Sequence, residues 1–290
     1  MPSAATLVAD AARRFAAAGL HFGHGTDNAE DEALFLVLHA LGWSYDIESA
    51  ALDVPLDAAQ RAAVEALVRA RIETRRPAAY LTGRMWFAGL EFAVDERVLV
   101  PRSPLAELIA ARFEPWRAGR PVARLLDIGT GSGCIAIACA HYFPAARVDA
   151  SDISPDALAV ATANVARHGL GDRVMLHQAD LFPPAAAGYD IIVSNPPYVP
   201  HGVWRELPPE YLAEPRLGLD AGTDGMICLE GILAGAAAAL APHGLLVVEV
   251  GEIWPEVQAR WPALPFTWIE FVHGGEGVFV LTREDLVALG

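Results

Sequence analysis

Apolar residues recur at helical spacing through the first part of the chain, in three separate runs. The runs cover Ala4–Ala18, Asp27–Gly42 and Asp57–Arg76, and the last two open with the residue pattern of a capping box. Pro77 follows the third run and cannot continue a helix, because proline lacks the backbone N–H that the helix needs. The pattern predicts a small helical domain over residues 1–79.

The period changes from helical to alternating over residues 80–105. Met85–Phe87 and Leu90–Val94 flank a turn and alternate as β-strands do, and Arg97–Val100 is a further β-prone run. The segment Pro101–Pro104 follows, and its two prolines stiffen the backbone. We predict a β-hairpin linker between two domains.

From residue 106 to residue 290, short apolar runs alternate with amphipathic stretches. The predicted strands are Arg124–Ile128, Arg147–Ile153, Val174–Ala179, Tyr189–Ser194, Leu245–Val250, Phe266–Phe271 and Gly277–Leu281. The predicted helices are Gly133–Tyr142, Pro155–Arg167 and Met226–Leu240. Strands that alternate with helices form a parallel sheet, and the short link between the last two strands predicts one antiparallel edge. The fold class is therefore α/β, with a doubly wound, mostly parallel sheet of seven strands.

The composition is that of a globular chain. Hydrophobic residues make up 53% and charged residues 20% of the 290 positions. No apolar run approaches the roughly 20 residues that span a bilayer, and the N-terminus lacks the basic and apolar regions of a signal peptide. Cys134, Cys139 and Cys228 are too few and too irregularly spaced for a disulfide framework or a metal site. These features predict a cytoplasmic protein with no metal centre and no membrane partner.

The charge of the chain is strongly acidic, with a formal net charge of -15. Such a charge opposes non-specific binding to nucleic acid and favours a basic protein partner. All 21 basic residues are arginine, so a Walker-type phosphate loop and a lysine Schiff base are excluded. Arg69, Arg71, Arg75 and Arg76 lie towards the end of a predicted helix, where they complement its dipole, so we interpret them as structural.

The first strand of the predicted sheet ends in a glycine-rich loop. Glycine lets the backbone approach a ligand closely at the first turn of a doubly wound fold, where adenosine cofactors bind. The loop alone is a weak signal, because Rossmann dehydrogenases have similar glycines. The candidate cofactor-binding residues of this loop are Asp127, Gly129, Thr130, Gly131, Ser132 and Gly133.

Acidic residues end the next two predicted strands. Asp152, followed by Ile153, stands about twenty residues after the glycine loop, where an acid binds ribose hydroxyls. Asp180, followed by Leu181, combines a carboxylate with an apolar neighbour and suits the amino group and ring of adenine. Each acid alone could be a helix N-cap, but the succession of loop and two acids favours a nucleotide site.

The fourth strand stops at two prolines. Asn195 and Pro196 offer a side-chain oxygen and a carbonyl oxygen as acceptors for the two hydrogens of a planar NH₂ group. Tyr198 offers a flat face, and Pro197 stiffens the loop. An amide nitrogen is a poor nucleophile, and acceptors on its hydrogens would orient its lone pair towards a bound electrophile. The alternative is that the prolines only terminate a strand.

The position of this loop separates methyl transfer from hydride transfer. A nicotinamide enzyme needs a proton-handling His, Tyr or Lys across the sheet from the glycine loop, and a Tyr-x-x-x-Lys motif is impossible without lysine. Asn195–Tyr198 stands there instead. Methyl transfer to an amide or amino nitrogen is the reaction that these residues favour.

These motifs together resemble the class I S-adenosylmethionine-dependent methyltransferases that modify an amide or amino nitrogen. A helical domain followed by a hairpin and this catalytic domain is similar to the bacterial protein-(glutamine-N(5)) methyltransferases. The resemblance implies S-adenosylmethionine over Gly129–Gly133, with its ribose on Asp152 and its adenine near Asp180. Asn195 is also counted among the cofactor-binding residues, besides its catalytic role. It also implies domains at 1–79 for substrate recognition and at 106–290 for catalysis.

The family has two branches, and the resemblance favours one of them. The branch that acts on peptide-chain release factors carries a Pro-Arg-Pro-x-Thr-Glu segment, from which Pro101–Glu107 departs. The other branch methylates a glutamine of large-subunit ribosomal protein L-three. The segments that resemble this second branch are Gly23–Asn28, Val94–Pro104, Leu217–Leu219, Gly222–Gly225 and Pro265–Trp268. The implied partner is therefore that basic ribosomal protein.

Two other functions remain as alternatives. An adenine N(6) DNA methyltransferase uses the same tetrapeptide on a flipped base, but it needs a basic face that this acidic chain lacks. A ribosome-assembly factor would bind the cofactor and a basic protein without catalysis. Only the resemblance, and not the chemistry of the residues, indicates the substrate.

Overall fold

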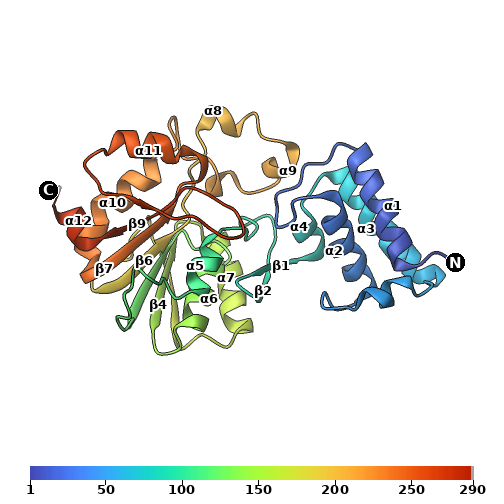
Figure 1. Ribbon diagram of the computed structural model, residues 1–290, viewed down its shortest axis with the longest axis horizontal. Coiled ribbons are helices and arrows are strands. Elements are labelled where there is room, and N and C mark those ends of the chain that lie inside the picture. The colour runs from blue at the N-terminus through green and yellow to red at the C-terminus, as the bar shows by residue number, and fades with distance from the viewer. Residues whose placement is uncertain (289–290) are drawn as a thin grey trace.

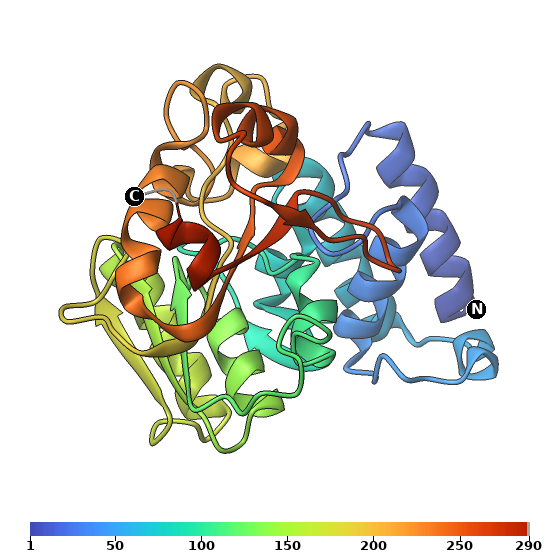
Figure 2. The same ribbon diagram turned by 60° about the vertical axis from the view of Figure 1, so that its left-hand side comes forward.

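The computed structural model of the chain describes residues 1–288. A helical N-terminal part stands beside a larger part built on a sheet (Figures 1 and 2), and Figure 1 shows a hairpin between them. None of the helices formed by these residues has the length and apolar character needed to cross a lipid bilayer.

The N-terminal helices pack around a small apolar core of their own, which includes Phe15, Leu36 and Val64. The capping box predicted at Asp57 is present: the Asp57 side chain accepts from the Gln60 N–H, and the Gln60 side chain accepts from the Asp57 N–H. These helices are α1 (Ala4–Ala17), α2 (Ala29–Leu41), α3 (Ala58–Thr74) and α4 (Ala78–Thr82), with a 3-10 turn at Ser49–Asp53.

The predicted hairpin is confirmed for two of its three runs. β1 (Arg84–Phe87) and β2 (Leu90–Ala93) pair antiparallel. The prediction of a strand at Arg97–Val100 was wrong, because its backbone bonds elsewhere. The N–H of Val98 closes a turn on the carbonyl of Asp95, and the N–H of Val100 donates to the Glu214 carboxylate at 2.9 Å.

A seven-stranded sheet among the described residues confirms the predicted fold class. Its order is β5-β4-β3-β6-β7-β9-β8, with parallel pairs up to β7 and antiparallel pairs at β9. The reversal of strand order lies between β3 and β6, which is where ligands bind in such sheets. The strands are β3 (Arg124–Ile128), β4 (Arg147–Asp152), β5 (Val174–Gln178), β6 (Tyr189–Ser194), β7 (Leu240–Glu249), β8 (Thr267–Trp268) and β9 (Val278–Thr282).

Helices cover both faces of the sheet, and each face has its own apolar core (Figure 1). One face carries α5 (Leu105–Ala110), α6 (Cys134–Tyr142) and α7 (Pro155–Arg167). The other carries α10 (Ile227–Ala239), α11 (Trp254–Arg260) and α12 (Arg283–Val287). Between β6 and α10 the chain forms α8 (His201–Trp204), α9 (Pro209–Leu212) and a 3-10 turn at Arg216–Gly218, and another 3-10 turn follows β7 at Gly251–Ile253.

Two predicted strands of the sheet differ from the structure by more than one residue at an end. The predicted strand Leu245–Val250 begins earlier, at Leu240, because Leu240 already pairs with Tyr189 before an irregularity in the ladder. The predicted strand Phe266–Phe271 shrinks to Thr267–Trp268 at the edge of the sheet. The unpredicted helices α4, α5, α8, α9, α11 and α12 are too short to carry a helical period.

Candidate active site

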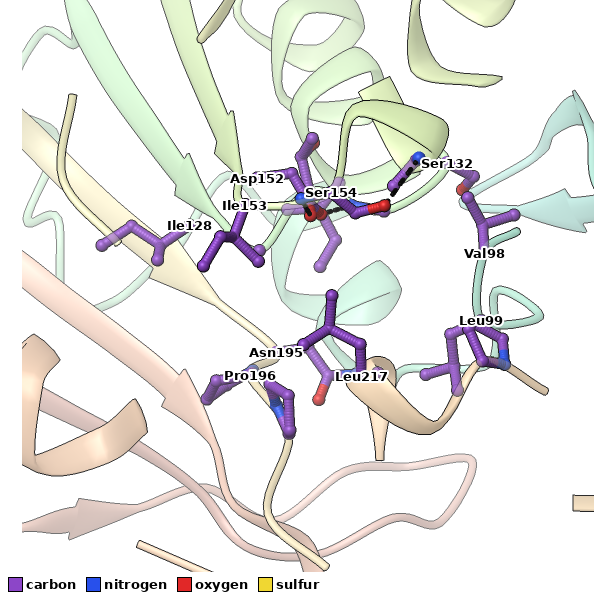
Figure 3. Close-up of a pocket in the computed structure, with 18 of the residues that line it drawn as sticks. Val98, Leu99, Ile128, Ser132, Asp152, Ile153, Ser154, Asn195, Pro196 and Leu217 are labelled. Atoms are coloured by element: carbon purple, nitrogen blue, oxygen red, sulfur yellow. Dashed lines mark hydrogen bonds between the residues drawn. The ribbon is translucent and has the colours of Figure 1, made fainter. Parts of the chain in front are cut away.

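A cavity of about 240 Å³ opens at the carboxyl ends of β3, β4 and β6 (Figure 3). Further parts of its wall come from residues 179–181 after β5, from the linker segment 97–103 and from the turn at 215–218. The predicted site residues that line it are Gly129, Thr130, Gly131, Ser132, Asp152, Ile153, Asp180, Leu181, Asn195, Pro196 and Pro197. Asp127, Gly133 and Tyr198 are not part of its lining, and they support residues that are.

The glycine loop is held against the neighbouring strand by its backbone. The N–H groups of Gly129 and Thr130 both donate to the Ser151 carbonyl at 2.9 Å. Gly133 has a positive φ of 81°, and a Cβ there would lie 3.3 Å from the Cβ of Ala161. A glycine at this position therefore lets α6 start close to α7.

Asp127 stabilises the conformation of this loop through hydrogen bonds. Its Oδ2 accepts hydrogen bonds from the Thr130 hydroxyl at 2.6 Å and from the Ala136 N–H at 3.1 Å. Burial raises the pKa of Asp127 to about 7, although both donors favour the ionised form. The carboxylate acts on the shape of the loop and not on its open side.

Asp152 lies at the end of β4 with its carboxylate at the cavity wall. Its two oxygens accept from the N–H groups of Gly131 and Ser154, both at 2.9 Å. Burial raises the pKa of Asp152 in spite of these donors. Each carboxylate oxygen keeps a lone pair for a hydroxyl in the cavity.

Apolar side chains flank this acid. Ile153 is 50% exposed, and Leu181 also lines the cavity. Gly231 of α10 makes room for Leu181, because a Cβ on Gly231 would lie 2.3 Å from the Leu181 Cδ1. These two side chains offer apolar surface on which a flat ring can lie.

In the loop after β6, some residues line the cavity and others pack behind its wall. Asn195, Pro196 and Pro197 line the cavity. The Tyr198 ring packs where a Cβ of Gly251 would come within 2.6 Å of it, and its hydroxyl donates to Glu249 at 3.4 Å. The stacking role of Tyr198 therefore stays a prediction.

Glu249 ties three segments together behind the site. It ends β7, is only 6% exposed, and accepts from the hydroxyls of Ser103 and Tyr198. Burial raises the pKa of Glu249 to about 7, although Ser103, Arg102 and Tyr198 favour the ionised form. The linker, the loop after β6 and the central sheet thus meet at one carboxylate.

The wall formed by the linker and the turn at 215–218 was not predicted from the sequence. Glu214 joins the two, because its carboxylate accepts from Val100 and binds the Arg102 guanidinium at 2.6 and 2.7 Å. Its side chain is fully buried, as is that of His24, 3.4 Å away on the N-terminal part. Glutamate is rarely buried, so its residue type gave no signal.

A second buried glutamate anchors α9 to the N-terminal helices. Glu210 accepts from the His21 N–H at 3.1 Å and pairs with Arg75 at 2.7 Å. Arg71 lies 3.5 Å from Glu210 and pairs with Glu32 at 2.7 Å. These contacts agree with the structural interpretation of the arginine cluster.

The cavity has two halves of different chemistry. Figure 3 shows Ser132, Asp152, Ile153 and Ser154 in its upper half, and Asn195, Pro196, Leu99 and Leu217 in its lower half. The upper half fits the cofactor that the resemblance implies. A Cβ on Gly129 or Gly131 would meet no protein atom within 4 Å, so the backbone faces open space, and Asp152 offers acceptors for ribose hydroxyls. The lower half leaves room for the group to be modified.

Family models match two parts of the chain. Residues 6–83 match the PrmC N-terminal domain, and residues 108–206 match the Methyltransferase small domain. The second match covers the glycine loop, Asp152 and the Asn195–Tyr198 loop.

Curated relatives match nearly the whole chain. A protein of Xanthomonas campestris pv. campestris is 50% identical over 95% of this chain and 89% of its own length. A protein of Neisseria gonorrhoeae is 47% identical over 96% of this chain and 93% of its own length. Both are named ribosomal protein uL3 glutamine methyltransferase.

Solved structures share the fold at low identity. The hMettl16 catalytic domain in complex with MAT2A 3'UTR hairpin 6 has a TM-score of 0.52 and 16% identity. The similarity covers 76% of this chain and 79% of that one. It supports the class I methyltransferase fold alone.

Proposed function

This chain belongs to the family of ribosomal protein uL3 glutamine methyltransferases, and we propose that it methylates the side-chain amide of a glutamine in that ribosomal protein. The methyl donor is S-adenosylmethionine, whose sulfonium supplies an electrophilic methyl group. The observation that carries the proposal is one shared cavity, lined both by the glycine loop with Asp152 and by Asn195 with Pro196.

The chain's own residues orient the glutamine. The Asn195 side-chain oxygen and the Pro196 carbonyl accept the two hydrogens of the amide, which fixes the plane of the nitrogen. Positive charge develops on that nitrogen as it gains a methyl group, so both acceptors bind the transition state more tightly than the ground state. The nitrogen loses a proton after alkylation, when the proton is acidic, so no side chain needs to act as a general base.

The remaining residues support this arrangement. Gly129, Gly131 and Asp152 hold the cofactor, with Asp180 and Leu181 at its adenine. Asp127 and Gly133 shape the glycine loop. Pro197 and Tyr198 fix the loop after β6, Tyr198 through its hydroxyl on Glu249.

The parts of the chain divide the work. Residues 1–79 form a substrate-recognition domain, residues 80–105 a linker, and residues 106–290 the catalytic domain. The net charge of -15 suits a basic ribosomal protein and opposes binding to the phosphates of nucleic acid, so we expect no direct sequence-specific binding of nucleic acid. The enzyme acts in the cytoplasm, where ribosomal proteins are made, and has no membrane partner.

Transfer of labelled methyl groups tests the proposed function. Purified enzyme and labelled S-adenosylmethionine are incubated with uL3, with a release factor and with duplex DNA in separate reactions. We expect label on a glutamine of uL3, located by mass spectrometry of its peptides. Label on the release factor or on DNA alone, or tight cofactor binding without transfer to any acceptor, would contradict the proposal.

Replacing Asp152 separates the cofactor half from the glutamine half. Asp152→Ala removes a charged acceptor, and hydrogen bonds to charged groups contribute roughly 1.5–3 kcal/mol, so we expect cofactor affinity to fall about tenfold to a hundredfold. Isothermal calorimetry with S-adenosylmethionine measures the change. Asp156→Ala, in the first turn of α7, is the matched control. Equal affinities of wild type and Asp152→Ala would remove this acid from the site.

A further inference from the structure

Leu217 has an exposed apolar side chain in the lower half of the cavity. It lines the cavity together with Asn195 and Leu99, and 55% of its surface is exposed. The chain on either side is firmly held, so the exposure of Leu217 does not come from a loose loop. An apolar side chain that is held in place and exposed beside a reaction site can form an apolar contact with a substrate.

Glu214 fixes the start of the turn that carries Leu217. Its carboxylate accepts from the Val100 N–H at 2.9 Å and binds Arg102 through two hydrogen bonds. Pro215 follows directly, and the Gly218 N–H donates to the Pro215 carbonyl at 2.9 Å. These hydrogen bonds therefore fix the position of the turn relative to the linker.

The end of the turn is tied to the loop that carries Asn195. The Val199 N–H donates to the Leu219 carbonyl at 2.9 Å, and the Ala221 N–H donates to the Val199 carbonyl at 3.0 Å. A Cβ on Gly218 would lie 3.8 Å from Leu99, so the turn also packs on the linker. Leu217 thus has a set position relative to Asn195.

We propose that Leu217 is a specificity-determining residue that lies against the methylene stem of the substrate glutamine, and that Glu214 is the positioning residue that holds it there. The inference rests on the proposed function and extends it to the substrate contact. Asn195 and Pro196 bind only the amide end of the side chain. The two methylene groups behind the amide need an apolar wall, and Leu217 with Leu99 supplies it.

Steady-state kinetics with purified uL3 as acceptor tests the role of Leu217. Leu217→Ala should raise the KM for uL3 about tenfold, as expected for lost apolar contact with a substrate stem. Its affinity for S-adenosylmethionine, measured by calorimetry, should stay that of the wild type. Leu217→Met keeps an apolar side chain of similar length and should restore most of the lost KM.

Leu212→Ala is the matched control for this experiment. Leu212 lies on α9 five residues earlier, is 42% exposed, and is not part of the cavity lining. Its KM for uL3 should equal that of the wild type. If Leu217→Ala and Leu212→Ala have the same KM, the inference is overturned while the proposed function stands. If the wild-type enzyme transfers no methyl group to uL3, both are overturned.

A double-mutant cycle tests the role of Glu214. Glu214→Gln loses the charge that binds Arg102, so the turn shifts and the KM for uL3 rises. Adding Leu217→Ala to Glu214→Gln should then raise KM by clearly less than tenfold, because Leu217 has already lost its position. Independent, multiplicative effects of the two substitutions would show that Glu214 does not act through Leu217.

Discussion

Asn195→Ala should lower kcat by roughly a hundredfold or more, as does the loss of one preorganised contact to a developing charge. In the proposed mechanism Asn195 acts mainly on the substrate amide, so the affinity for S-adenosylmethionine should change far less than kcat. Single-turnover transfer of labelled methyl to uL3 measures the rate, and calorimetry measures the affinity.

A second substitution at the same position shows that the acceptor matters. Asn195→Asp keeps an oxygen acceptor in the same place and should retain more turnover than Asn195→Ala. Full turnover of Asn195→Ala, or an equal loss in the two variants, would remove the acceptor role. A fall in cofactor affinity that accounts for the whole loss would move Asn195 to the cofactor half.

Much of the fold could be predicted because certain residue types determine the local backbone structure, such as the end of a strand or the start of a helix. The four β-prone residues within Tyr189–Ser194 and the prolines after this run define both a central strand and its end. Asp57 and Gln60 define a helix start by a bond across three residues. The glycine loop, Asp152 and Asn195 stand at the carboxyl ends of β3, β4 and β6, which run parallel, so the sheet brings them to one edge.

The linker shows why the rest could not be predicted. Val98 and Val100 are fully buried and β-prone, as in a strand. The backbone of Val100 pairs instead with a carboxylate 114 residues later in the sequence. No local pattern distinguishes a partner strand from a distant side chain, because both satisfy the same N–H group.

The burial of two glutamates at the site could not be predicted from the sequence either. Glu214 and Glu249 are 4% and 6% exposed, whereas most glutamates lie on the surface. Their burial depends on Arg102 and Ser103, which reach them only after the linker has folded over the sheet. The linker and the turn at 215–218, which form part of the lower half of the cavity, could therefore be placed there only from the tertiary structure.

Glu214→Ala should destabilise the protein by about 3–5 kcal/mol, as expected when one partner of a buried ion pair is removed. Arg102, with a side chain only 20% exposed, would keep its charge without the carboxylate that binds it, and the Val100 N–H would lose its acceptor. Urea unfolding, followed by far-UV circular dichroism, measures the free energy of unfolding.

Glu65→Ala is the control for this comparison. Glu65 also binds an arginine through two hydrogen bonds, to Arg14, but its side chain is 52% exposed. Surface ion pairs contribute about 0–1 kcal/mol, because water screens both charges. Equal destabilisation by the two substitutions would mean that the burial of Glu214 does not increase its contribution to the free energy of unfolding.

The pH dependence of stability gives an independent signature of the same pair. Burial alone would raise the pKa of Glu214, but Arg102 and His24 outweigh burial and hold it at about 2. The pKa in the unfolded chain is about 4.3, so the carboxylate stabilises the fold fully above that pH and progressively less as the pH falls towards 2. The stability difference between wild type and Glu214→Ala should therefore shrink on acidification below about pH 4.3. A difference that stays constant down to pH 2 would mean that packing, and not the charge of Glu214, accounts for the loss.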